Sequence, residues 1–292
     1  MGEKVPRRFD VRAGFSKEAA QDALIEAGAI ILTNLDPTSE WSYVASMVPI
    51  HVWDTHELLL ERHRADSVTK EHAALKLEGA ALPPHSDGYR WGDCFPDLVI
   101  LVCEEPAAEQ NGANYLIDGK AVFDRLTDAT KTILMEELID HTERTENSFT
   151  QGPESVAPVF RFLKPKGWRK RGNSSYLCWR RMVTKDASEV KANALVRGAT
   201  IPYLSLWTPL DTTTTGPRSG EIEAALLELD QAIEAEDALA PRFVLKWGEA
   251  LIVDNFRMLH AREDFLGFET KRQRWRVGSW TNSALGLPPE IK

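Results

Sequence analysis

The sequence has few cysteines and no long apolar run. Its 292 residues include three cysteines, Cys94, Cys103 and Cys178, and no pair has the Cys-x-x-Cys spacing of a zinc or redox motif. This odd number of thiols indicates free cysteines in a reducing compartment, so we expect a cytoplasmic protein. No apolar run approaches the roughly 18 residues of a membrane span, and the first residues lack the apolar stretch of a signal peptide. We therefore expect no membrane partner.

Positive charge is also scarce. Lys and Arg total 35 against 44 Asp and Glu, which gives a net charge of −9. Nucleic acids and anionic membranes favour a basic protein face, so neither is expected as a partner. The glycine-rich patterns that cradle nucleotide phosphates are missing as well. We expect a small-molecule substrate, and the composition is compatible with a homo-oligomer.

The pattern of the chain changes near residue 82. Before it, the sequence predicts a helix over 16–28, capped by Ser16 and ended by Gly28, then a buried strand over 29–33 and a second helix over about 38–63. After it, short β-type runs alternate with turn residues, at 98–103, 114–117, 159–163, 250–253 and 275–280. Two helices, at 121–138 and 220–236, interrupt these strands.

This order of elements predicts a mainly β fold with flanking helices, either a sandwich or a barrel. The sequence contains no internal repeat and no linker, so we expect a single domain over residues 1–292. Its helical N-terminal part covers about 1–75, and its β core, with helical insertions, covers about 82–282.

The segment His85-Ser86-Asp87 has the spacing of a metal-binding pair. In an extended strand, residues i and i+2 point to the same face, so this imidazole and carboxylate can converge on one cation. His260, at the end of a strand–turn–strand pattern, is the candidate third ligand. Two His and one carboxylate on one face of an octahedron leave three positions open, as in Fe(II) sites that bind a chelating cosubstrate and O₂. A His-x-Asp pattern alone also occurs by chance in proteins without a metal.

Arginines are concentrated just after His260. Between residues 255 and 280, six Lys and Arg face three Asp and Glu, a local charge of +3 within a protein at −9. Arg274 and Arg276 would share one face of a strand, and a guanidinium can grip the free carboxylate of a dicarboxylate cosubstrate with two hydrogen bonds. The alternative interpretation is a surface strand with solvated charges.

Together, several blocks resemble the taurine and 2,4-dichlorophenoxyacetate dioxygenase superfamily, including its clavaminate-synthase-like and γ-butyrobetaine hydroxylase-like members. The resemblance runs over about residues 82–280 and depends on the order of short blocks. The blocks are His85-Ser-Asp87, Asn111-Gly-Ala-Asn114, Asp118-Gly119, the run from Trp247 to His260, and Arg274-Trp275.

The resemblance implies a double-stranded β-helix core, also called a jelly roll or cupin-like core. It implies Fe(II) bound by His85, Asp87 and His260, with 2-oxoglutarate as cosubstrate and O₂ as oxidant. Arg274 lies 14 residues after His260, at the spacing of the family arginine that binds the distal carboxylate of 2-oxoglutarate. Asn114 stands where the family often has Thr or Ser, and its amide can still donate a hydrogen bond to that carboxylate.

The implied reaction oxidises an unactivated C–H bond and releases succinate and CO₂. The outcome is hydroxylation, desaturation or oxidative cyclisation. The family's substrates point to a small amino acid or another carboxylate-bearing metabolite, in secondary metabolism. Arg276, Tyr89, Arg90 and Trp91 are candidate substrate contacts, although Arg276 would equally suit a salt bridge and the aromatic residues would also suit a packed core.

Two alternatives stay open at this point. A cupin-type metal enzyme of another class would use the same His, Asp and His ligands without 2-oxoglutarate. A catalytically silent binding protein would keep the fold without binding iron tightly, and the intact set of ligands speaks against it.

Overall fold

The computed structural model describes the chain in twelve stretches. The described residues are 5–12, 14–52, 60–64, 82–87, 95–106, 112–137, 139–140, 156–172, 175–179, 208–209, 219–263 and 273–286. Within them, sheet predominates and a few helices flank it, which confirms the predicted mainly β class.

The largest sheet has six strands in the order β1-β2-β12-β5-β14-β3. Their bounds are β1 Arg7–Asp10, β2 Ala29–Thr33, β12 Ala250–Asp254, β5 Leu98–Glu105, β14 Gln273–Ser279 and β3 Leu60–Arg64. Only β1 and β2 run parallel; the other neighbours are antiparallel. The part of the chain predicted as helical therefore also supplies three strands of this sheet.

A second sheet of three strands faces the first and has the order β4-β13-β6. Its strands are β4 Leu82–His85, β13 Met258–Arg262 and β6 Asn114–Asp118. Two smaller sheets complete the β structure, with β9 Phe160–Leu163 and β10 Tyr176–Trp179 in one, and β7 Ile139–Asp140, β8 Val156–Ala157 and β11 Thr208–Pro209 in the other.

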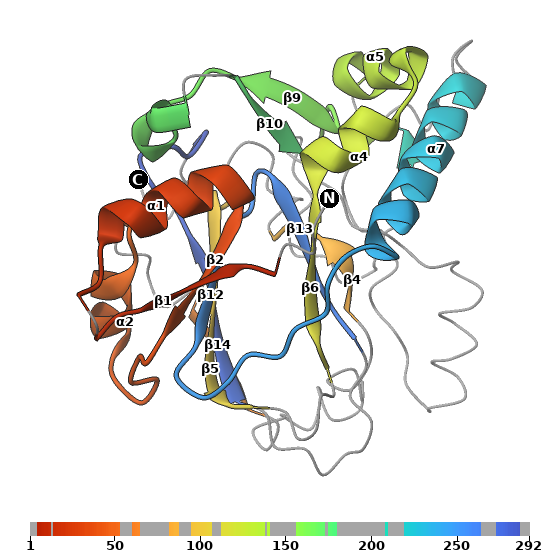
Figure 1. Ribbon diagram of the computed structural model, residues 1–292. Coiled ribbons are helices and arrows are strands. Elements are labelled where there is room, and N and C mark those ends of the chain that lie inside the picture. Colours follow the sequence, from red (N-terminus) through yellow and green to blue (C-terminus); the bar gives the residue numbers. More distant parts are fainter. Residues whose placement is uncertain are drawn as a thin grey trace, which may run out of the picture.

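Helices cover the outer faces of the two main sheets (Figure 1). The helices are α1 Lys17–Ala27, α2 Trp41–Met47, α4 Gly119–Arg125, α5 Asp128–Glu136 and α7 Ser219–Asp237, with a 3₁₀ helix, η5, at Gly167–Gly172. Helices α1 and α2 pack on the six-stranded sheet, and α4, α5 and α7 pack outside β6 and β13.

Alternation along β5 separates the two faces of the six-stranded sheet. Leu98, Ile100 and Val102 pack toward α1 and α2. Val99, Leu101 and Cys103 belong to another buried cluster, which also contains Met258 of β13 and contacts Leu116 of β6. Because successive side chains of a strand point to opposite faces, this cluster, here called the inner core, is the apolar layer between the two sheets.

The predicted first helix and the strand after it are confirmed. Ser16 accepts a hydrogen bond from the Ala19 N–H, and α1 ends at Gly28 in the left-handed conformation, with φ 77°. A side chain at Gly28 would also lie 2.6 Å from the Met258 sulfur. Glycine at this position therefore both ends the helix and permits close packing against β13.

The prediction of a second helix over 38–63 is wrong at its C-terminal end. Helix α2 ends at Met47, because Val48 precedes Pro49 and has an extended ψ of 133°, the conformation that a following proline favours. Residues 60–64 form strand β3, which pairs with β14 at the edge of the sheet. Pairing with a strand distant in sequence therefore overrides the helix predicted for residues 60–63.

The helix predicted over 121–138 is divided in two. Leu126 adopts an extended conformation after α4, and Thr127 then caps α5 by accepting a hydrogen bond from the Thr130 N–H. Threonine favours this N-cap position because its hydroxyl satisfies a free N–H of the first turn. Helix α7 follows the prediction closely.

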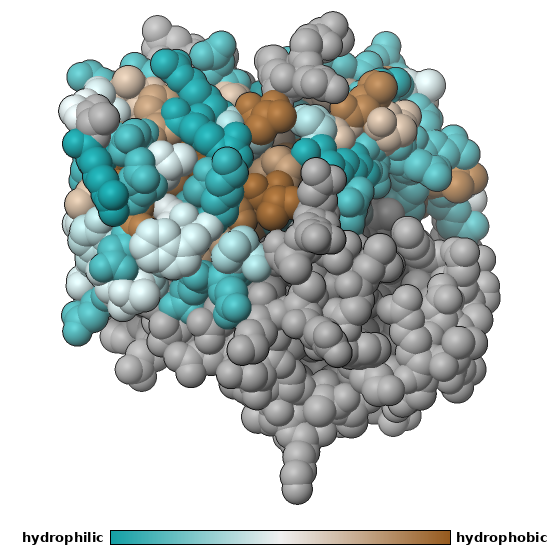
Figure 2. Space-filling view, turned by 60° about the horizontal axis from the view of Figure 1, so that its bottom comes forward, coloured by the Kyte–Doolittle hydropathy of each residue, from teal (hydrophilic) through white to brown (hydrophobic). Residues whose placement is uncertain are grey.

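Few large hydrophobic residues are exposed in the part of the chain that the structure describes. They are Val5, Phe162, Leu227, Leu239 and Trp247, and the coloured part of the face in Figure 2 is mostly hydrophilic with a few apolar places. Single exposed hydrophobic residues are normal for a protein surface. None of the helices in the described ranges has the length and hydropathy to span a membrane.

We expect Gly119→Ala to lower the free energy of unfolding by about 1–3 kcal/mol, because the added methyl group would overpack a filled space. A Cβ at Gly119 would lie 2.3 Å from the Trp179 ring nitrogen and 2.8 Å from the Arg257 carbonyl oxygen. Gly220, at the start of α7, meets nothing within 4 Å, so Gly220→Ala is the matched control and should be neutral or slightly stabilising. Urea denaturation of both variants checks this, and equal stabilities would contradict it.

Candidate metal centre

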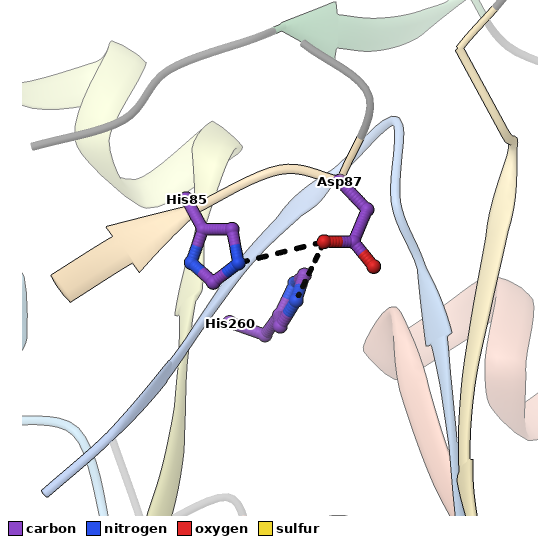
Figure 3. A group of neighbouring side chains, drawn as sticks. All are labelled: His85, Asp87 and His260. Atoms are coloured by element: carbon purple, nitrogen blue, oxygen red, sulfur yellow. Dashed lines mark ion pairs between the residues drawn. The ribbon is translucent and has the colours of Figure 1, made fainter. Parts of the chain in front are cut away.

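Strands β4 and β13 bring the predicted metal ligands together. The antiparallel register pairs His85 directly with His260, and residues paired in this way share a face of the sheet. Asp87 lies two residues beyond His85, just past the end of β4. Figure 3 shows the two imidazoles and the carboxylate pointing toward one another.

The donor atoms of these three residues are close enough to share one ion. The Asp87 Oδ1 atom lies 3.5 Å from His85 Nε2 and 3.6 Å from His260 Nε2, and one ligand atom from each residue lies within 4.8 Å of the others. Two atoms that each bind an ion at about 2.1 Å lie roughly 3.0–3.4 Å apart in octahedral or tetrahedral geometry. Small side-chain shifts would thus bring all three onto one divalent cation.

The group is also buried and electrostatically suited to a cation. The relative exposure is 5% for His85, 5% for His260 and 9% for Asp87, and the histidine ring centroids are 4.3 Å apart. Two imidazole nitrogens and one carboxylate oxygen form a donor set that iron and similar transition metals accept. The residues present therefore fit a metal ion.

A residue that the sequence analysis did not single out, Asn255, holds the backbone of Asp87. The Asp87 N–H donates to Asn255 Oδ1 at 2.9 Å, and Asn255 Nδ2 donates to the Asp87 carbonyl oxygen at 2.9 Å. The local signals for this residue are its position in a polar turn after the apolar strand 250–253 and its place within the run from Trp247 to His260 that resembles the family. Its partner lies 168 residues away in sequence, so no pattern within the chain indicates the contact.

A buried ionic network lies beside this turn. Arg169, which is 4% exposed, donates from Nε to Asp254 Oδ2 at 3.1 Å and from Nη1 to Asp97 Oδ2 at 3.2 Å. Asp97 also accepts hydrogen bonds from the N–H and the hydroxyl of Thr281 and from the ring N–H of Trp168. Such hydrogen bonds offset the cost of burying charge, and they fix the ends of β5 and β12.

Arg257 anchors the other side of the same turn. Its guanidinium donates to both carboxylate oxygens of Asp118, and Nη1 donates to the carbonyl oxygens of Ile25 and Glu26 at the end of α1. Burial alone would lower the pKa of Arg257, but the hydrogen bonds and charge of Asp118 more than offset it and the pKa is raised. The start of β13 is thereby tied to α1 and β6.

The structure describes some of the residues that were predicted to bind cosubstrate and substrate. Asn114 is 3% exposed and begins β6, where its N–H donates to the Phe243 carbonyl oxygen at 2.7 Å. The backbone register pairs Arg274 with Cys103 and Arg276 with Leu101. Tyr89, Arg90 and Trp91 lie outside the described residues, and their predicted role stays a prediction.

A family comparison matches residues 3–280 with the taurine catabolism dioxygenase TauD, TfdA family. The chain belongs to this family. The predicted enzyme class, a non-haem iron dioxygenase that depends on Fe(II), 2-oxoglutarate and O₂, is thereby confirmed. Among curated protein sequences, no significant match was found.

Several solved structures share the fold of this dioxygenase at low sequence identity. PvcB, described as an Fe, alpha-ketoglutarate dependent oxygenase from an isonitrile synthetic pathway, has a TM-score of 0.57 at 11% identity, with 96% of this chain and 88% of PvcB covered. Asparagine oxygenase in complex with Fe(II), 3-hydroxyasparagine and succinate has a TM-score of 0.59 at 15% identity, with coverage of 89% and 78%. OrfP in complex with Fe and L-Arg has a TM-score of 0.53 at 16% identity, with coverage of 91% and 80%.

We expect a divalent metal such as Co(II) to raise the melting temperature of the wild-type protein and to have little effect on Asp87→Ala. A ligand at 100 times its Kd stabilises the folded state by about 2.7 kcal/mol, and removal of the carboxylate takes away the charged donor. Asp124→Ala, which removes an exposed carboxylate from α4, is the control and should keep the full metal-induced shift. Thermal denaturation with Co(II) and with a chelator measures the effect; an equal shift in Asp87→Ala would exclude Asp87 as a ligand.

Proposed function

We propose that this dioxygenase binds Fe(II) through His85, Asp87 and His260 and oxidises an unactivated C–H bond of a small amino acid or another carboxylate-bearing metabolite. The observation that carries the proposal is the convergence of two imidazoles and one carboxylate at a buried point beside β4 and β13. Three ligands on one face leave adjacent positions for a bidentate keto acid and for O₂. Family membership favours this function over a cupin-type enzyme that does not use 2-oxoglutarate.

The chain's own contribution to the reaction is positioning and exclusion of water. When bound, iron supplies the activation of O₂ together with 2-oxoglutarate, which leaves as succinate and CO₂. His85 and His260 would hold the ion from paired strands, and Asp87 would balance part of its charge. The inner core, with Leu101, Leu116 and Met258, supplies apolar surroundings beside the site.

Arg274 and Asn114 are proposed to bind the distal carboxylate of 2-oxoglutarate. The register supports this role, because position 274 pairs with Cys103, whose side chain belongs to the inner core. The segment from Phe243 to Gly248 is hydrogen-bonded through its backbone to Asn114 at one end and to Cys103 at the other. Because position 274 pairs with Cys103, Asn114 and position 274 lie at the same end of the two sheets. An arginine and an amide there would suit a carboxylate.

The proposed substrate class is a free amino acid or a similar small carboxylate. The complexes of asparagine oxygenase with 3-hydroxyasparagine and of OrfP with L-Arg support this class. We propose that Arg276, two positions beyond Arg274 on β14, binds the substrate carboxylate. Hydroxylation, desaturation and cyclisation, and the place in secondary metabolism, stay predictions.

We further infer that the two facing sheets form a jelly-roll core and that the chain is a single domain. The apolar layer shared by β5, β12 and β13 supports this inference, as does the similarity to PvcB over 96% of the chain. The cytoplasmic location and a homo-oligomer stay predictions.

The proposed function is tested by anaerobic titration of the metal-free protein with Fe(II) and 2-oxoglutarate. We expect a visible charge-transfer band, because the keto acid would chelate iron through its carboxylate and keto oxygens. Admission of O₂ should remove the band and yield succinate. Binding of Fe(II) without a band would contradict a keto-acid site and favour the cupin-type alternative.

We expect Arg274→Ala to raise the KM for 2-oxoglutarate at least about 30-fold, because the bound distal carboxylate would lose its charge-assisted partner at a cost of about 2–5 kcal/mol. Arg125→Ala, on the exposed face of α4, is the control and should leave this KM unchanged. Succinate formation at varied 2-oxoglutarate concentrations measures both. If the KM of Arg274→Ala is unchanged, the role of Arg274 is excluded and Arg276 becomes the next candidate.

A further inference from the structure

Asn255 lies between the two segments that carry the proposed metal ligands. It follows β12 directly, in the turn that leads to β13 and His260, and its side chain is fully buried. On its other side it contacts the segment after β4 that carries Asp87. One side chain therefore connects the two parts of the site.

The carboxamide of Asn255 pairs with the Asp87 backbone as a neighbouring strand would. A carboxamide presents one acceptor and one donor side by side, like a peptide group. The acceptor takes the Asp87 N–H and the donor contacts the Asp87 carbonyl oxygen, both at 2.9 Å. The second hydrogen of Nδ2 is used as well, toward the Pro96 carbonyl oxygen at 2.7 Å. Asp87 lies beyond the end of β4, so Asn255 extends backbone pairing past the end of that strand.

The position of Asn255 is itself fixed from behind. Its own N–H donates to the Asp97 carbonyl oxygen at 3.1 Å. The buried guanidinium of Arg169 forms ion pairs with Asp97 and with Asp254, the residue just before Asn255. A shift of the Asn255 carboxamide would thus disturb its hydrogen bonds to Asp87 and to Pro96. These contacts restrict the position of the carboxamide that bonds to the Asp87 backbone.

We propose that Asn255 is a positioning residue that sets the Asp87 carboxylate for metal binding before the metal arrives. This inference rests on the proposed function, since it takes Asp87 as a metal ligand. A ligand whose backbone is already fixed loses little freedom when the ion binds, so the affinity is higher than for a mobile ligand. Groups that orient metal ligands typically contribute 10–100-fold to metal affinity.

The test compares Asn255→Ala and Asn255→Ser with Thr130→Val. Thr130 is buried in α5 and its hydroxyl donates a partly buried hydrogen bond to Glu228 of α7, so its variant loses a hydrogen bond that does not involve Asp87 or Asn255. For each protein, thermal denaturation without metal measures stability. Titration with Co(II), followed by its visible ligand-field spectrum, measures affinity and the geometry around the ion.

We expect all three variants to be less stable than the wild type, but only those at Asn255 to bind Co(II) differently. Their Kd should rise about 10–100-fold, with a changed spectrum, whereas Thr130→Val keeps the wild-type Kd and spectrum. Variants of Asn255 that lose stability but bind Co(II) with the wild-type Kd and spectrum would overturn the proposal. Failure of both to fold would assign Asn255 to folding instead and would also overturn it.

The wild-type protein separates this inference from the proposed function. Co(II) binding that is tight in the wild type and weakened in the Asn255 variants, without a charge-transfer band from Fe(II) and 2-oxoglutarate, would contradict the proposed oxygenase function and still support the role of Asn255 in metal binding. A wild-type protein that binds no divalent metal would overturn both.

Discussion

Strand β13 is hydrogen-bonded on both edges, and the metal centre depends on the register of that pairing. With β4 it sets His260 opposite His85, and with β6 it sets His260 opposite Leu116. A slip of one residue would turn His260 away from Asp87 and toward the cluster that contains Leu259 and Ala261. Contacts at both ends of β13 oppose such a slip. Just before the strand, Arg257 forms an ion pair with Asp118, and at its last residue the paired Asn114 is held by backbone hydrogen bonds to Phe243.

The parts of the structure that follow from local sequence were predictable. Helix α1 has its cap and its terminal glycine within its own segment, and β2, β5 and β12 are short apolar runs bounded by turn residues. His85 and Asp87 are two residues apart, so their convergence needs only one extended segment. Pro49, which follows the end of α2, is also a local signal for a helix end, and the helix predicted over 38–63 does not take it into account.

The parts that depend on distant partners were not predictable from one sequence. Asn255 is one of several polar residues in a turn until Asp87 is placed beside it, 168 residues away. Arg169 resembles the lysines and arginines around it, yet it is buried between Asp97 and Asp254. The same limit applies to β3, whose charged residues give no apolar alternation and whose strand conformation comes from pairing with β14. Tertiary context decides all three.

The order of strands in the six-stranded sheet has a consequence for the synthesis of the protein. β12 lies between β2 and β5, although 216 residues separate it from β2 and 144 residues separate it from β5 in sequence. Until a ribosome has passed residue 254, the facing edges of two mostly apolar strands lack the strand that joins them. Unpaired strand edges of this kind attract other chains. A chain cut short before β12 would consequently be prone to aggregation, and the growing full-length chain would need protection from aggregation until nearly all of it has been synthesised.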